Sequence, residues 1–188
     1  IRGEPSYRVA ETGAADAVRE TATSAKRTAR QARKVPGVAR AEGQVKGAVA
    51  VTVERFGKLD VLYNCAGGSR TEDDLVTEVD LSVWQHTITL DVLGPLLCCR
   101  HAIPRIIAAG GGAVINMSSG AALRGASPAH IYTSAKGAIL SLTRALAGAY
   151  AKDGVRVNAI GAGRILTERI TSRYGTIDKP GPVDDLQD

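Results

Sequence analysis

The chain has 188 residues, of which 44% are hydrophobic and 23% charged, a balance that predicts one folded domain and excludes wholesale disorder. No apolar run approaches the roughly 18 residues of a membrane span, and the first residues lack the layout of a signal peptide. Three cysteines without a Cys-x-x-Cys pair argue against a disulfide framework or a zinc ribbon, and they predict a reducing, cytoplasmic location.

The net charge of +5 at pH 7 is concentrated at the start of the chain. Residues 1–40 hold nine Lys/Arg and four acidic residues, and we treat them as an atypical basic N-terminal segment. Its composition predicts a basic helix or a disordered arm rather than buried strands. Because its basic run Lys26–Lys34 lacks aromatic stacking residues and a binding motif, we do not predict a nucleic-acid partner.

Residues 41–170 alternate between helical and strand-like patterns, and residues 171–188 have the composition of a loop or tail. The expected helices are 44–56, 82–107 and 129–152, and the expected strands are 59–64, 113–118 and 155–160. Ser82 is the expected N-cap of the second helix, while Pro95 and Pro104 predict kinks or breaks within it. Strands joined by helices through short connections predict a parallel sheet and an α/β fold.

Three polar residues combine into a candidate catalytic set. Ser119 ends a strand at the carboxyl edge, where open α/β sheets bind ligands, and Tyr132 and Lys136 follow on a helix. Positions i and i+4 share one helix face, so the lysine ammonium can approach the tyrosine hydroxyl. A free phenol has a pKa of about 10, and a nearby cation favours the phenolate that proton transfer near neutral pH requires. The set suits the interconversion of an alcohol and a ketone.

Simpler interpretations exist for each part of this set. A Tyr-x-x-x-Lys pair alone is more often two neighbours on a helix surface, and a serine after a strand more often caps the next segment. Ser119 is not in a Gly-x-Ser-x-Gly turn, which argues against an α/β-hydrolase. The three histidines, which share no ligand spacing with cysteines or carboxylates and predict no metal site, are His86, His101 and His130.

The joint pattern resembles the short-chain dehydrogenase/reductase family over roughly residues 42–179. The matching stretches are Leu59–Gly67 (LDVLYNCAG), Val114–Ser119 (VINMSS), Tyr132–Lys136 (YTSAK) and Arg156–Gly163 (RVNAIGAG) with Thr167. This resemblance implies a Rossmann-type, doubly wound parallel sheet and NAD or NADP as cofactor. It also implies an oxidoreductase that acts on a small secondary alcohol or ketone.

The resemblance also assigns site residues. It implies Ser119 as the catalytic serine, Tyr132 as the acid/base and Lys136 as the lysine beside the nicotinamide ribose, and it places Asp91 where the family has a catalytic asparagine. An ionised aspartate cannot donate from its side chain as an asparagine does. The implied cofactor-binding residues are Asn64, Ala66, Gly67, Tyr132, Lys136, Gly163, Ile165 and Thr167.

The front of the chain departs from the family pattern. The family's glycine-rich pyrophosphate turn has one counterpart, Thr12–Arg19, which keeps one glycine of three. We therefore expect an incomplete sheet with degenerate N-terminal strands and no last strand, as in a truncated or disrupted family member, and weak dinucleotide binding. The alternative function is a non-catalytic remnant that acts as a dimerising interaction module, since the family forms homodimers or homotetramers through its two long helices.

Overall fold

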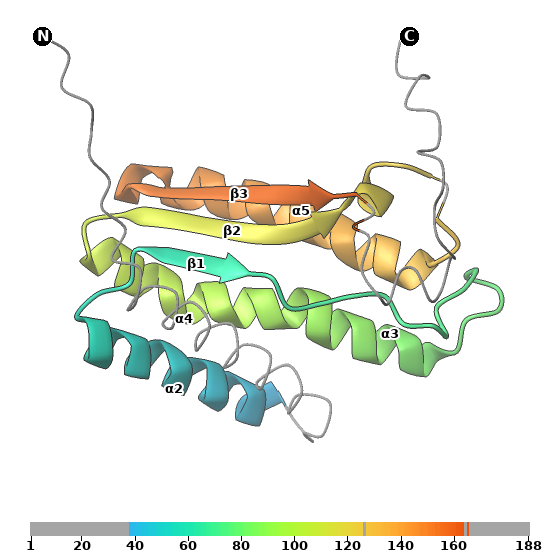
Figure 1. The fold of residues 1–188 in the computed structure, drawn as a ribbon, viewed down its shortest axis with the longest axis horizontal. Helices are drawn as coiled ribbons and strands as arrows, with labels where there is room; N and C mark the ends of the chain where they lie inside the picture. The colour runs from blue at the N-terminus through green and yellow to red at the C-terminus, as the bar shows by residue number, and fades with distance from the viewer. Residues whose placement is uncertain (1–37, 126, 164, 166–188) are drawn as a thin grey trace, which may run out of the picture.

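The computed structural model describes residues 38–125, 127–163 and 165, so the predictions for the pyrophosphate turn and for Thr167 lie outside this part of the chain. The division into 1–40, 41–170 and 171–188 stays a prediction. Figure 1 shows the elements, which are helices α2 (Val38–Phe56), α3 (Leu81–Ile88), α4 (Gly94–Ala108) and α5 (His130–Tyr150) and strands β1 (Val61–Asn64), β2 (Gly112–Ser119) and β3 (Val155–Ala162).

The described strands form one parallel sheet in the order β1-β2-β3. Helices α3 and α4 connect β1 to β2, and α5 connects β2 to β3, which confirms the predicted Rossmann-type α/β arrangement here. Asn64 pairs with Asn116, and Ser119 pairs with Ala162, so the carboxyl ends of all three strands lie at one edge. This edge is where a sheet of this kind binds ligands.

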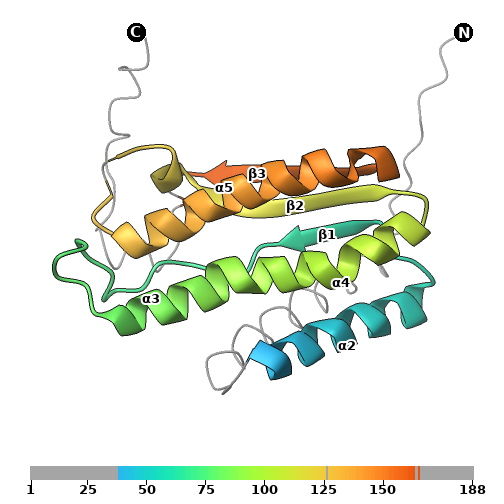
Figure 2. The same cartoon turned by 180° about the vertical axis from the view of Figure 1, so that it is seen from behind.

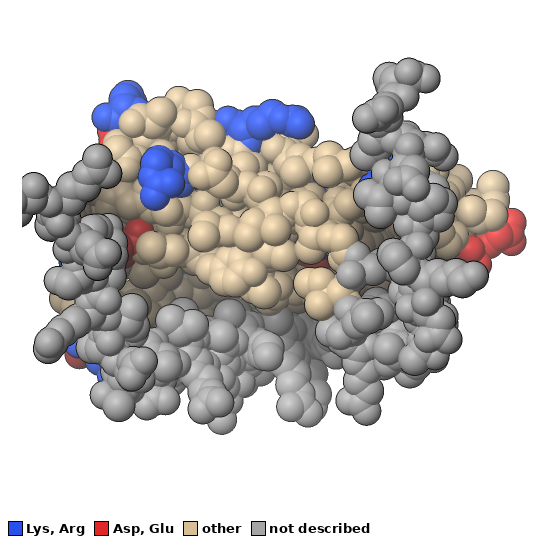
Figure 3. Space-filling view, turned by 45° about the horizontal axis from the view of Figure 1, so that its top comes forward, with Lys and Arg blue, Asp and Glu red and all other residues tan. Residues whose placement is uncertain are grey.

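The described helices that contact the sheet lie on one of its faces (Figures 1 and 2). The core between α4 and the sheet includes Ile103, Ile106 and Val114, each at most 2% exposed. On the opposite face the side chains of Val61 and Tyr63 are about half exposed. Figure 3, which brings β3 forward, shows mostly uncharged residues in the middle of the visible surface.

The second helix begins at a different residue from the expected one. Asp80, not Ser82, is the N-cap of α3, and its carboxylate accepts a hydrogen bond of 2.7 Å from the Ser82 N–H. The prediction that Ser82 caps this helix is therefore wrong. Both residue types are good N-caps, and the choice depends on which backbone leaves the helical conformation first.

The expected long helix is three consecutive pieces. A π-helical turn at Thr89–Leu93 separates α3 from α4, and Pro95 lies in the first turn of α4, directly after that π-helical turn. The interruption predicted near Pro95 is thus confirmed. At Pro104 the predicted interruption does not take the form of a break: helix α4 continues through this residue to Ala108, because its buried isoleucines hold it against the sheet.

Candidate active site

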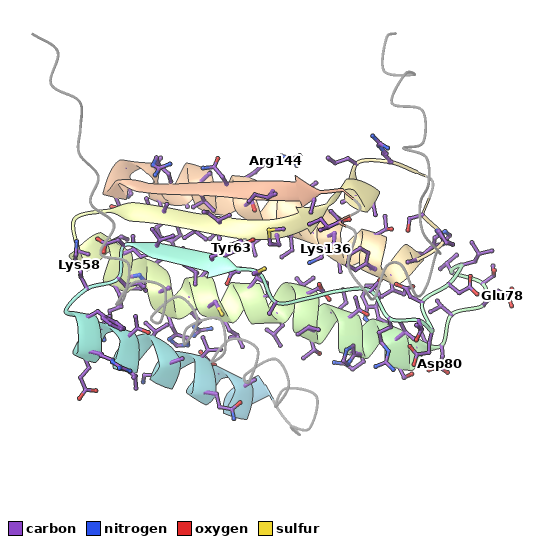
Figure 4. The ribbon with its side chains drawn as sticks, viewed as in Figure 1. Lys58, Tyr63, Glu78, Asp80, Lys136 and Arg144 are labelled. Atoms are coloured by element: carbon purple, nitrogen blue, oxygen red, sulfur yellow. The ribbon has the colours of Figure 1, made fainter. Side chains whose placement is uncertain are left out.

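The candidate catalytic pair lies on the first two turns of α5, beside the carboxyl edge of the sheet. Lys136 Nζ lies 5.6 Å from the centre of the Tyr132 ring, as the four-residue spacing predicts. The lysine is 4% exposed, and its ammonium donates a 3.1 Å hydrogen bond to the carbonyl of Met117 on β2. Figure 4 shows Lys136 between α5 and the ends of the strands, so the helix and the sheet together fix its position.

Asp91 is the ionic partner of Lys136. Its Oδ1 lies 2.8 Å from Lys136 Nζ, and its carboxylate accepts the Gly68 N–H at 3.1 and 3.4 Å. Asp91 is fully buried and belongs to the π-helical turn between α3 and α4. The family resemblance pointed to this residue, whereas its pairing with Lys136 is a feature of the folded chain that the sequence did not indicate.

Burial and nearby cations act in opposite directions on the Asp91 carboxyl. Burial raises its pKa, and this effect exceeds the lowering by Lys136, by the Gly68 N–H and by the charge of His86. The net result is a pKa above the ordinary value of 3.8. The folded protein therefore holds the Asp91 proton more tightly than the unfolded chain does.

This shift predicts a stability difference that depends on pH. Asp91 adds to the free energy of unfolding at acidic pH, and that contribution is lost as the pH rises above 3.8 and through the raised pKa. Urea unfolding of the wild type and of Asp91→Asn, which cannot titrate there, measures the difference across this range. We expect the wild type to lose stability relative to the variant as the pH rises, whereas a relative gain would show that the pairing with Lys136 outweighs burial.

Residue 67 has to be a glycine, because the turn after β1 approaches the ion pair of Asp91 and Lys136 closely. Its φ of +155° suits glycine. A Cβ added there would overlap Asp91 Oδ1 and would lie 3.0 Å from Lys136 Nζ. The predicted cofactor-binding glycine therefore lies directly against two of the predicted catalytic residues.

Ser119 lies at the end of β2, half-buried at the same edge of the sheet. Its hydroxyl accepts the Ala121 N–H at 3.2 Å and caps the short 3-10 turn that follows the strand. No hydrogen bond in the described part of the chain joins Ser119 to Tyr132. The neighbouring Ser118 instead connects the strand to α5, because its hydroxyl donates to the Lys136 carbonyl at 2.8 Å.

The Asn64 side chain forms its hydrogen bonds inside the protein. It is 8% exposed, and its amide donates to Asn116 Oδ1 at 2.8 Å and contacts Cys99 Sγ at 3.4 Å. Asn116 in turn donates to Thr143 Oγ1 on α5 at 2.9 Å. These hydrogen bonds between side chains join β1, β2 and α5 beneath the site. Burial raises the pKa of the nearby Cys99 thiol to about 12 and keeps the thiol protonated.

The remaining described residues of the predicted cofactor site lie at the same edge. Ala66 is half-buried, and Gly163 and Ile165 are exposed after β3. The Cα of Gly163 lies 4.0 Å from the position of a Cβ built on Gly120, which places the segments after β2 and β3 side by side. The structure therefore brings three strand ends and the start of α5 around one exposed region.

Sequence reasoning missed Asp73, which lies 6% exposed in the loop between β1 and α3. Its two carboxylate oxygens accept the backbone N–H groups of Ile131 and Tyr132, at 3.1 and 2.8 Å. No sequence signal marks this contact, because 58 residues separate Asp73 from the helix it reaches. His130, one of the three histidines considered above, accepts the Val76 N–H at its Nδ1.

Two features are absent from the part of the chain that the structure describes. Within residues 38–125, 127–163 and 165, no group of three His, Cys, Asp or Glu side chains could hold a metal ion. None of the helices in this part of the chain is long and apolar enough to cross a membrane.

Comparisons with known proteins show which family the chain resembles in sequence. A family model described as "Enoyl-(Acyl carrier protein) reductase" matches residues 6–179. A Bradyrhizobium diazoefficiens protein named "Probable short-chain type dehydrogenase/reductase" is 40% identical over 136 residues, which is 71% of this chain and 48% of that protein. The 2-(R)-hydroxypropyl-CoM dehydrogenase of Xanthobacter autotrophicus is 36% identical over 127 residues, 67% of this chain and 51% of that protein.

A solved structure extends the likeness to three dimensions. The structure of ElxO with NADP bound aligns with a TM-score of 0.67 at 34% identity, over 70% of this chain and 53% of that one. The chain therefore spans about half the length of the curated relatives and the solved structure that it matches.

Proposed function

The chain belongs to the short-chain dehydrogenase/reductase family, and from this membership we propose that it interconverts a small secondary alcohol and a ketone with NAD or NADP. The observation that supports the proposal best is the placement of Tyr132 one helical turn from a buried lysine that is fixed by Met117 and Asp91. A relative named 2-(R)-hydroxypropyl-CoM dehydrogenase and another named D-threitol dehydrogenase support an alcohol as the substrate class.

Each residue has a role in this proposal. Tyr132 transfers the proton to or from the substrate oxygen, and Lys136 places a positive charge 5.6 Å from the centre of its ring. Ser119 orients the substrate oxygen with its hydroxyl, which can donate to a ligand while it accepts the Ala121 N–H. Asp91 holds the Lys136 ammonium in place through the 2.8 Å ion pair.

The site also fits a nicotinamide cofactor. When bound, the nicotinamide supplies or accepts the hydride. Lys136 has three N–H groups, and its described contacts to Asp91 and Met117 use two of them, which leaves the third for a ribose hydroxyl. Gly67, which lies against Lys136, and Gly163, which follows β3, are both exposed and have no side chain that would block a ligand. The ElxO structure, which has NADP bound, supports NADP as a first probe.

A cofactor oxidation assay tests the proposed function. We expect the chain, at millimolar NADPH or NADH, to oxidise the cofactor with at least one member of a panel of small ketones, and to reduce the oxidised cofactor with the matching secondary alcohol. The measurement is absorbance of the reduced nicotinamide, with circular dichroism as the check that the chain is folded. A folded chain that shows no turnover with any ketone and either cofactor contradicts the proposal.

The second candidate is a non-catalytic module that forms homodimers or homotetramers through its long helices. The exposed hydrophobic side chains of Leu81, Trp84 and Leu96 on α3 and α4 favour a helix surface that packs against a second copy. Both this assembly and a cytoplasmic location stay predictions.

A further inference from the structure

Asp73 binds the first turn of α5 from a distant part of the chain. The first N–H groups of a helix have no partner within the helix, and the residue before α5, Ala129, gives no side-chain cap. The Asp73 carboxylate supplies that cap, because Oδ1 accepts the Ile131 N–H and Oδ2 accepts the Tyr132 N–H. A carboxylate is also favoured there by the helix dipole.

Two further hydrogen bonds fasten the same loop to the same turn. His130 Nδ1 accepts the Val76 N–H at 3.0 Å, and the His130 N–H donates to the carbonyl of Asp74 at 3.3 Å. Residues 73–76 and the start of α5 are thus joined by four hydrogen bonds, of which the two to the Asp73 carboxylate are charge-assisted.

Lys136 is held by a separate set of contacts. Its carbonyl accepts the Ser118 hydroxyl, and its ammonium contacts Met117 and Asp91. None of these contacts involves the loop around Asp73. The second turn of α5 is therefore anchored to the sheet, whereas the first turn, which carries Tyr132, is anchored by Asp73.

We propose that Asp73 is a positioning residue that fixes Tyr132 relative to Lys136. The proposal rests on the proposed function, in which the tyrosine transfers a proton with the help of the lysine. Without the Asp73 carboxylate the first turn of α5 frays, since two buried or half-buried N–H groups lose their acceptors. The Tyr132 ring then no longer keeps its distance of 5.6 Å from the Lys136 ammonium.

The test compares Asp73→Asn with Asp74→Asn. Both variants remove one negative charge at neighbouring positions, but the Asp74 carboxylate accepts only the Leu75 N–H of its own turn, at 2.8 Å, among its described contacts. The readouts are amide hydrogen exchange at Ile131 and Tyr132, the nuclear Overhauser contact between the Tyr132 ring and the Lys136 side chain, and kcat and KM for ketone reduction.

For Asp73→Asn we expect at least tenfold faster exchange of both amides, loss of the Overhauser contact, and a kcat at least tenfold lower with the cofactor KM within about twofold. Asp74→Asn should match the wild type in all three. Unchanged exchange, or faster exchange with an intact Overhauser contact and an intact kcat, overturns the proposal.

Two of the readouts do not need turnover, so they keep this inference separate from the proposed function. If the wild type reduces no ketone, the proposed function fails, while the Overhauser contact still shows whether Asp73 positions Tyr132. If Asp73→Asn does not fold, Asp73→Glu replaces it, because the glutamate keeps the charge and displaces the carboxylate by one methylene. We expect Asp73→Glu to show the same changes in smaller degree, and wild-type exchange with a wild-type Overhauser contact in that variant overturns the proposal.

Discussion

Replacement of Tyr132 by phenylalanine should lower turnover by a factor of about 10² to 10⁴, the range that general acid–base catalysis supplies. The substitution removes the hydroxyl that transfers the proton and keeps the ring beside Lys136. The backbone N–H of residue 132, which binds Asp73, is unchanged. The measurement is kcat for ketone reduction with the cofactor that the wild type prefers, together with the thermal midpoint as a check on folding.

A tyrosine on the same helix provides the control. Tyr150 is the last residue of α5 and packs partly against the hydrophobic core, four to five helical turns from the candidate site. Tyr150→Phe therefore changes the same functional group without reaching the site, and its turnover should stay within about twofold of the wild type. Equal turnover in Tyr132→Phe and in the wild type would remove Tyr132 from the mechanism.

The α/β fold could be predicted from local patterns. The short apolar runs that became β1, β2 and β3, and the helical periodicity of α5, are signals carried by neighbouring residues, and these four elements lie within two residues of their predicted bounds. Helix α2 instead begins at Val38, six residues before the expected start at residue 44. The errors lie at boundaries. Asp80 and Ser82 are both suitable caps, and the sequence holds no information on which of the two backbones leaves the helix.

The contacts that organise the candidate site could not be predicted in the same way. Asp73 reaches Ile131 across 58 residues, and the sequence gives no period or motif for such a contact. Asn64 shows the converse. The family pattern assigns it to the cofactor side, whereas the structure shows its amide bound to Asn116 and Cys99 beneath the sheet edge. The residue type at a motif position predicts which part of the fold the residue occupies, but the direction in which its side chain points depends on packing.

Removal of the Asp91 carboxylate should have the largest effect on stability. We expect Asp91→Ala to lower the free energy of unfolding by about 3–5 kcal/mol at neutral pH, the range for a buried ion pair that loses one partner. The Lys136 side chain is 5% exposed and would lose its ionic partner, while the Gly68 N–H would lose its acceptor. Chemical denaturation measures the loss.

The matched variant is Asp91→Asn, which introduces the residue type that the family resemblance implies at this position. An amide oxygen can still accept from Lys136 or from the Gly68 N–H, so this variant should lose less than half as much stability as Asp91→Ala. If the two variants lose the same amount, hydrogen-bond acceptance at residue 91 contributes nothing, and the loss comes from charge alone.

A double variant separates the ion pair from the packing around it. Replacing a buried ion pair by apolar residues of similar volume is often neutral or stabilising, whereas breaking it on one side is costly. Asp91→Leu with Lys136→Met should therefore be more stable than either single variant, even though it removes two residues of the proposed mechanism and should show no turnover. If the double variant loses the sum of the two single losses, the two side chains contribute independently, and the 2.8 Å contact between Asp91 and Lys136 contributes no coupling energy to the fold.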